Sequence, residues 1–137
     1  MLKRWRAELV ALVLGLAIGV GIALALGVGR GESEPDRVRD AATAYLQAFA
    51  DDDPTALCQH ISPLGRARLQ FGAQSCDASA QMSIARLPKG QRDALHDPKI
   101  AVVSVSANKA AVRFAPKLSG RGDMQLVKVG GQWLVND

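Results

Sequence analysis

The longest apolar run of the chain extends from Leu9 to Gly29 and contains no charged residue. A helix of that length, at about 1.5 Å per residue, spans about 30 Å, which matches the hydrocarbon core of a bilayer. The run therefore predicts a transmembrane helix over residues 9–29, preceded by a short tail at residues 1–8. A cleaved secretory signal is the alternative, because Ala23-Leu24-Ala25 has the small-x-small form of a cleavage site.

Basic residues on the two sides of this run predict its orientation. Lys3, Arg4 and Arg6 precede the run, and only Arg30 follows it directly. The positive-inside rule then predicts a cytoplasmic N-terminus and an extracytoplasmic C-terminal domain. The chain is thus expected to be a single-pass protein of the cell membrane, held by a signal-anchor.

Small residues recur every four positions within the apolar run. Gly15 and Gly19 form a G-x-x-x-G, a spacing that lets two helices approach closely in lipid. The alternative is that Ala and Gly are simply frequent here, since a second row of small residues lies on nearly the opposite side. Self-association through Gly15 and Gly19 is therefore one of two open interpretations.

The sequence after the apolar run reads as a tether followed by helices. Residues 30–36 are polar and predict a tether, and residues 37–137 predict the extracytoplasmic domain. Helical spacing of apolar side chains begins directly, at Val38, Ala42, Tyr45, Leu46 and Phe49. Further helices are expected at 54–61, 64–71 and 75–87.

The acidic triplet Asp51-Asp52-Asp53 has two interpretations. Asp53 followed by Pro54 is typical of a helix N-cap with proline at the first helical position. A metal site is the alternative, but consecutive carboxylates on a turn splay apart and no glycine-spaced calcium loop follows. The capping interpretation is favoured, and no metal or cofactor is expected.

The pattern changes near Lys99, where β-branched residues and period-two alternation replace helical spacing. Asn108-Lys109 and Gly130-Gly131 predict tight turns, and Pro116 to Gly122 predicts a longer connection. Strands are expected at 100–107, 110–115, 124–129 and 132–136. Helices followed by an antiparallel meander predict an α+β domain, with the helices packed on one face of a curved four-stranded sheet.

The net charge of +4 and the pI of about 9.4 come mostly from the first thirty residues. Residues 31–137 contain thirteen basic and twelve acidic side chains. A nucleic-acid-binding domain would need a clustered basic face. The composition therefore does not favour a nucleic-acid partner.

Both cysteines, Cys58 and Cys76, follow the predicted membrane segment. An extracytoplasmic compartment favours oxidation, so a Cys58–Cys76 disulfide is predicted, with a free buried pair as the alternative. Closing a loop of this length stabilises a fold by about 3 kcal/mol in the chain-entropy model.

Several segments together resemble the NTF2-like, cystatin-type α+β cone domains of small bacterial membrane-anchored proteins. These are the helix ending in an acidic turn, PTALCQHISP with a second cysteine eighteen positions after Cys58, NKAAVRF, and MQLVKVGGQWLVN. The resemblance covers about residues 36–137. It implies helices packed on a curved sheet, with a space between them that forms a pocket in some relatives, including isomerases and dehydratases.

Catalysis by such a cone requires an acid or base inside it, and the predicted strands contain few. Arg113 and Lys128 are expected on the outer face of the sheet, and Asp123 at a strand edge. His60 and His96 have no neighbouring nucleophile or metal ligand at a recognisable spacing. The aromatic side chains that are expected to line the core or a pocket are Tyr45, Phe49, Phe114 and Trp133.

The predicted function is a membrane-tethered accessory domain without catalysis, which binds a partner protein or a second copy of itself. A binder of a small apolar ligand within the cone is the first alternative, and an isomerase or dehydratase is the second. The adhesion-like tripeptide Arg121-Gly122-Asp123 is interpreted as a turn, because glycine is common in turns between strands.

Overall fold

The computed structural model describes residues 33–70 and 74–137. Residues Glu34–Asp137 form one compact unit of the chain. The predicted membrane segment 9–29, with Gly15 and Gly19, and the tail 1–8 lie outside the described residues. Within the described ranges, no helix is long and apolar enough to cross a membrane.

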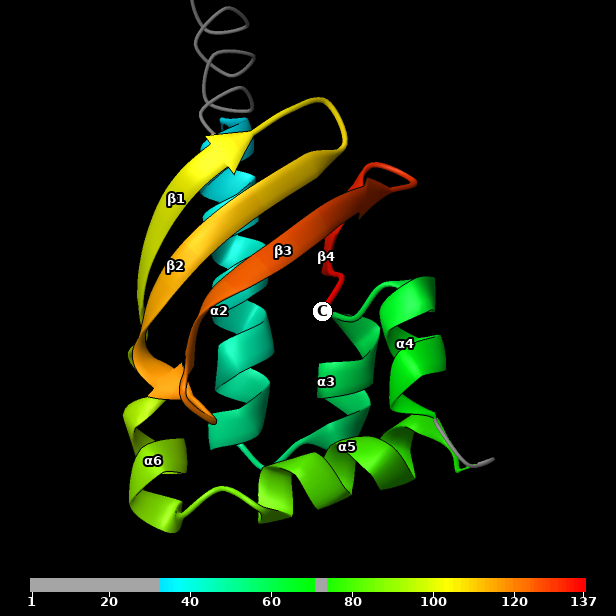
Figure 1. Ribbon diagram of the computed structural model, residues 1–137, viewed down its shortest axis with the longest axis vertical. Helices are drawn as coiled ribbons and strands as arrows, with labels where there is room; N and C mark the ends of the chain where they lie inside the picture. Colours follow the sequence, from blue (N-terminus) through cyan, green and yellow to red (C-terminus); the bar gives the residue numbers. More distant parts are fainter. Residues whose placement is uncertain (1–32, 71–73) are drawn as a thin grey trace, which may run out of the picture. The chain divides into compact units, whose positions relative to one another are not determined.

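Helices come first in the chain and an antiparallel sheet follows, which confirms the predicted α+β class (Figure 1). The four strands are arranged in the order β1-β2-β3-β4, each antiparallel to the next. The helices are α2 (Glu34–Ala50), α3 (Pro54–Gln59), α4 (Pro63–Leu69), α5 (Cys76–Ala85) and α6 (Lys89–Ala94), and the strands are β1 (Lys99–Val105), β2 (Lys109–Leu118), β3 (Arg121–Val129) and β4 (Gln132–Val135).

Helix α2 lies along one face of the sheet and contacts all four strands (Figure 1). Its buried side chains Val38, Ala42, Leu46 and Phe49 form the apolar stripe that the sequence predicts. The helix begins at Glu34, inside the segment predicted as a tether. Proline is tolerated in a first helical turn and acidic side chains favour the positive end of the helix dipole, so Glu34-Pro35-Asp36 suits this position.

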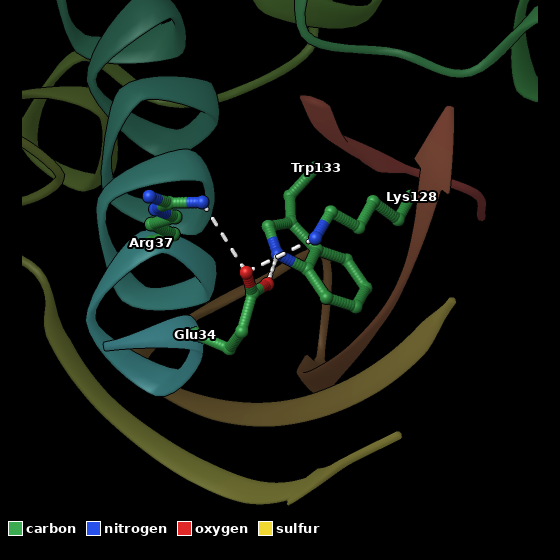
Figure 2. A network of polar contacts seen from close by, with 4 residues as sticks. All are labelled: Glu34, Arg37, Lys128 and Trp133. Atoms are coloured by element: carbon green, nitrogen blue, oxygen red, sulfur yellow. Dashed lines mark hydrogen bonds and ion pairs between the residues drawn. The ribbon is translucent and has the colours of Figure 1, made fainter. Parts of the chain in front are cut away.

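A polar network fastens the first turn of α2 to the sheet (Figure 2). The Glu34 carboxylate accepts hydrogen bonds from Lys128 Nζ at 3.0 Å and from Trp133 Nε1 at 2.8 Å, and Arg37 Nη1 lies 3.2 Å from it. The hydrogen bond from Lys128, followed by that from Trp133, lowers the pKa of Glu34. Lys128 also lies 5.8 Å from the centroid of the Trp133 ring.

Lys128 therefore faces α2, and the prediction that it lies on the outer face is wrong. It has the same register parity as Met124 and Leu126, which are buried. Its aliphatic stem can cover the edge of the core while its ammonium group reaches Glu34. Arg113, by contrast, is exposed between the buried Val112 and Phe114, as expected for the outer face.

Side-chain caps begin the short helices α3, α4 and α5. Asp53 Oδ1 accepts from Ala56 N at 3.0 Å, Ser62 Oγ from Gly65 N at 3.0 Å, and Ser75 Oγ from Ala78 N at 3.1 Å. The predicted cap at Asp53 with proline at the first helical position is confirmed. Such caps stabilise helix starts by about 1 kcal/mol each, which matters for helices of only 6 to 10 residues.

The sheet departs from the predicted pattern where β2 ends. The strand continues through Pro116 to Leu118, and only Ser119 and Gly120 connect it to β3, both with positive φ. The long connection predicted for 116–122 is wrong, and Arg121-Gly122-Asp123 begins β3 rather than forming a turn. Helix α6 was likewise not predicted from the sequence. None of its residues is buried, so the segment has no apolar periodicity that would indicate a helix.

A disulfide joins Cys58 in α3 to Cys76 at the start of α5, which confirms the predicted pairing. Both residues belong to the buried core cluster. The bridge therefore links two helices in a part of the molecule where no strand pairing connects them.

Replacing both cysteines, Cys58→Ala with Cys76→Ala, should lower the free energy of unfolding by about 3 kcal/mol. The reason is that the unfolded chain regains the freedom of an eighteen-residue loop. Urea unfolding of the oxidised protein, the reduced protein and the double variant would measure this. Reduction and double substitution should agree, and equal stability of all three would contradict a role for the bridge.

Candidate functional site

A cavity of about 210 Å³ lies between the helices and the last residues of the chain. Its lining comes from α2, α3, the turn between α3 and α4, α4, α5 and the segment after β4. Figure 1 shows where these elements lie. Most of these side chains are apolar, and polar groups occur at a few points only. The lining residues are Tyr45, Phe49, Leu57, Ile61, Gly65, Arg68, Leu69, Ser83 and Asp137.

The helical corner on one side of this cavity is attached to the sheet by backbone pairing. Ile61 forms a parallel bridge with Val135; Ser62 N donates to Val135 O at 2.7 Å, and Val135 N donates to His60 O at 2.8 Å. The Ser62 hydroxyl also bonds the Asn136 side chain. The corner between α3 and α4 therefore lies directly against β4, and the cavity remains beside it.

Gly65 permits this close approach. A Cβ atom at Gly65 would lie 2.6 Å from Ile61 Cγ2 and 3.3 Å from the Val135 carbonyl oxygen. A larger residue would clash with Ile61 and crowd the Val135 carbonyl, so the packing of this wall of the cavity favours glycine at this position.

Tyr45 supplies a hydrogen-bond donor in the cavity. Its ring meets Phe49 edge to face, with centroids 5.4 Å apart and an interplanar angle of 76°. Burial, followed by the nearby Asp137 carboxylate, raises the pKa of Tyr45 to about 12. The phenol is therefore neutral at physiological pH, and among the described residues no hydrogen-bond partner of its hydroxyl is found.

The rim beside Tyr45 is charged. Asp137 Oδ1 accepts from Gln125 N at 3.3 Å, and Asp137 Oδ2 lies 3.8 Å from Arg121 Nη2. Arg68 Nη1 donates to the Asn136 carbonyl at 3.4 Å. Burial raises the pKa of Asp137, while the Gln125 N–H and the two guanidinium groups oppose that rise. The Asp137 carboxylate thus already has hydrogen-bond and ion-pair partners. The Tyr45 hydroxyl remains available to donate a hydrogen bond to a molecule in the cavity.

The four aromatic residues singled out from the sequence divide between the cavity and the core. Tyr45 and Phe49 line the cavity. Phe114 is buried in the core cluster from β2, and Trp133 is buried with its indole N–H on Glu34. The polar residues Arg68 and Asp137 were not predicted as site residues, because no local sequence pattern indicates that both line the same cavity.

The two histidines lie outside the lining. His60 is half-buried, and burial lowers its pKa. His96 Nε2 lies 3.1 Å from Asp51 Oδ1, and its Nδ1 lies 2.9 Å from the Asp93 carbonyl oxygen. In the ranges that the structure describes, no three His, Cys, Asp or Glu side chains gather as a metal site. Within the acidic triplet, Asp53 caps α3 and Asp51 contacts His96.

Comparison with known proteins gives no assignment: the chain matches no protein-family model, no curated protein and no solved structure.

Alkaline titration of Tyr45 provides a direct test of the cavity environment. Tyr45 is the single tyrosine of the chain, so tyrosinate absorbance near 295 nm reports this residue alone. The midpoint is expected at about 12 instead of the ordinary 10.0. Because the raised pKa favours the neutral phenol in the folded state, its contribution to stability is complete below pH 10 and disappears as pH rises toward 12.

The urea-unfolded protein serves as the reference for this titration. Its midpoint should return to the ordinary value, since the phenol is then in water. A native midpoint equal to the unfolded one would show that the Tyr45 hydroxyl is fully hydrated, contrary to its placement in the cavity.

Proposed function

We propose that this chain is a membrane-tethered, extracytoplasmic binding domain without catalysis, whose cavity takes a small, largely apolar ligand. The observation that carries the proposal is the cavity of about 210 Å³, with an apolar lining and the Tyr45 hydroxyl within it. An apolar cavity with few polar groups is the general form of a small-molecule site. The ligand would present one hydrogen-bond acceptor to Tyr45, because a neutral phenol donates a hydrogen bond.

The extracytoplasmic location is supported by the disulfide and by the sequence before Glu34. A bridge between Cys58 and Cys76 suits an oxidising compartment. The apolar run 9–29, with its basic N-terminal flank, would supply the membrane anchor. We further propose that the helices and the four-stranded sheet form an NTF2-like cone, with this cavity among the helices beside the end of β4.

A protein partner is a weaker alternative for this domain. Large exposed apolar side chains in the described residues are Leu64, Met82, Val103 and Val129, and they belong to four different elements. Scattered single residues of this kind are normal on a protein surface, whereas partner sites gather them into one patch. Binding of a small ligand therefore has the stronger support.

The chemistry of the lining favours binding over catalysis. A general base needs a pKa near the working pH and access to the substrate. Tyr45 holds its proton far above neutral pH, and Asp137 is already engaged by Gln125 N and Arg121. We infer that these groups orient a bound molecule and do not transfer its protons.

The tether can be tested on the full-length chain by membrane flotation after alkaline extraction. We expect the protein to float with the lipid, and N-terminal sequencing of that fraction to begin at or near Met1. Val20→Arg should move most of the protein to the soluble fraction, because a charge at the centre of a span costs about 3 kcal/mol. The matched control Val103→Arg, on the sheet surface, should float normally. A membrane-free protein beginning after Ala25 would instead show a cleaved signal.

Ligand binding can be tested with a matched pair of probes, acetophenone and α-methylstyrene, on residues 33–137 with the disulfide formed. The two molecules have nearly the same shape, but only acetophenone has a carbonyl acceptor. Acetophenone should bind more tightly, and Tyr45→Phe should weaken it about two- to tenfold, the value of one hydrogen bond. NMR titration would measure both affinities.

Controls separate the hydrogen bond from the space. Tyr45→Phe should leave α-methylstyrene binding unchanged, and Ser83→Leu, which places a larger side chain on the cavity wall, should weaken both probes. Ser106→Ala, in the loop between β1 and β2, should affect neither. Saturable binding of neither probe would contradict the proposed function.

A further inference from the structure

The outer sheet face, the side of β1, β2 and β3 turned away from α2, has an unusual charge. It presents the basic side chains Lys99, Lys109, Arg113 and Lys117, all exposed, against the single carboxylate of Asp123. The remaining described residues have nine basic and ten acidic side chains. The domain is thus nearly neutral in total, but its positive charge is concentrated on one side.

The strand register places these cations on a common surface. Lys99 pairs with Ala115, Ala101 with Arg113, and Arg113 in turn with Asp123. Paired residues in a sheet point to the same face, and successive outward residues of one strand are separated by about 7 Å. Along β2 the outward positions alternate between basic residues and alanine. The small alanine side chains leave the basic groups protruding, so an extended surface such as a membrane could contact them.

This face is hollowed between two of its cations. A depression of about 300 Å³ is lined by Lys99, Ala101, Arg113 and Ala115, together with Ile100 and Phe114 of the same strands. Ammonium and guanidinium groups beside an apolar floor suit a phosphate ester whose remainder is apolar. Beside the depression, Val103 is 56% exposed, in the bulged segment of β1.

We propose that the outer sheet face docks on anionic phospholipid headgroups of the membrane in which the chain is anchored, with a lipid phosphate between Lys99 and Arg113. The inference rests on the membrane tether of the proposed function. From Gly29, the end of the apolar run, to Glu34 there are five peptide steps, a reach of about 17 Å at most. A domain held that close to a bilayer meets headgroups at a very high local concentration.

Geometry permits the sheet to lie flat on the lipid. Helix α2 packs on the opposite face, so Glu34 would stand above the headgroups by roughly the thickness of the sheet and half a helix, on the order of 10 Å. Together with the headgroup layer, about 5–7 Å thick, the distance to be spanned is on the order of 16 Å, so the five-step link would be nearly fully extended. The helices that enclose the cavity would then remain on the side away from the membrane.

The docking can be tested with the full-length protein in lipid nanodiscs. Ser104 is exposed on the outer sheet face, where it pairs with Ala111. Ser104→Cys gives a thiol that can be labelled with a fluorophore while the disulfide stays oxidised. A nitroxide on the lipid headgroup should quench this label strongly in discs that contain phosphatidylglycerol and weakly in discs of phosphatidylcholine alone. High salt should remove the difference, since it screens surface charge.

Matched charge removals identify the surface. Lys99→Gln with Arg113→Gln and Lys117→Gln should reduce the ratio of docked to undocked protein about a hundredfold in anionic discs. The control removes the same charge elsewhere, at Arg66, Arg86 and Lys89, and should leave quenching unchanged. Equal quenching in neutral and anionic discs, or an equal loss in both triple variants, would overturn the docking. A protein that does not co-elute with the discs would contradict the tether and the docking together.

Discussion

The attachment of the helical corner to β4 is the constraint on which the rest of the domain depends. Backbone hydrogen bonds between His60, Ser62 and Val135 join segments more than seventy residues apart in sequence. They close the helical layer onto the sheet edge opposite β1, and the absent side chain of Gly65 makes the distance possible. On the far side, α2 is fixed by its apolar stripe and by the Glu34 contacts with Lys128 and Trp133. The cavity of about 210 Å³ lies beside the corner attachment, among the helices and the last residues of the chain.

The chemistry of that cavity follows from where the attachment leaves the chain. Val135 is bound to the corner, so the next residues run beside Gln125 of β3 and bring Asp137 to the rim. The same path places a carboxylate near Tyr45, which adds to the effect of burial on the pKa of its phenol. The disulfide holds α5 against α3 and so completes the wall that contains Ser83. The site therefore combines a rigid apolar wall, one neutral donor and a rim whose charges largely compensate each other.

Local signals in the sequence predicted most of the elements, and long-range contacts account for the errors. The stripe on α2, the Asp53 cap and the Gly130-Gly131 turn each depend on neighbouring residues, and all three are found. By contrast, β2 continues through Pro116 because the residues on both sides of the proline have distant partners. Ala115 pairs with Lys99 of β1, and the Lys117 carbonyl accepts a hydrogen bond from the Gln91 side chain. Alternation along β3 puts Lys128 on the inward side with Met124 and Leu126, but only the folded chain shows its partner Glu34, ninety-four positions away. Arg68 and Asp137 both line the cavity because of long-range contacts, which no local pattern in the sequence encodes.

The net charge of the domain likewise does not reveal how its charged side chains are arranged on the surface. Residues 31–137 contain nearly equal numbers of basic and acidic side chains. Yet folding places four basic side chains on one sheet face and many of the carboxylates among the helices. The field at a surface depends on the charges within about a Debye length, near 10 Å, and not on the sum over a domain. A nearly neutral domain can therefore be attracted to an anionic bilayer through one side, and a short link to the membrane would make a weak attraction sufficient.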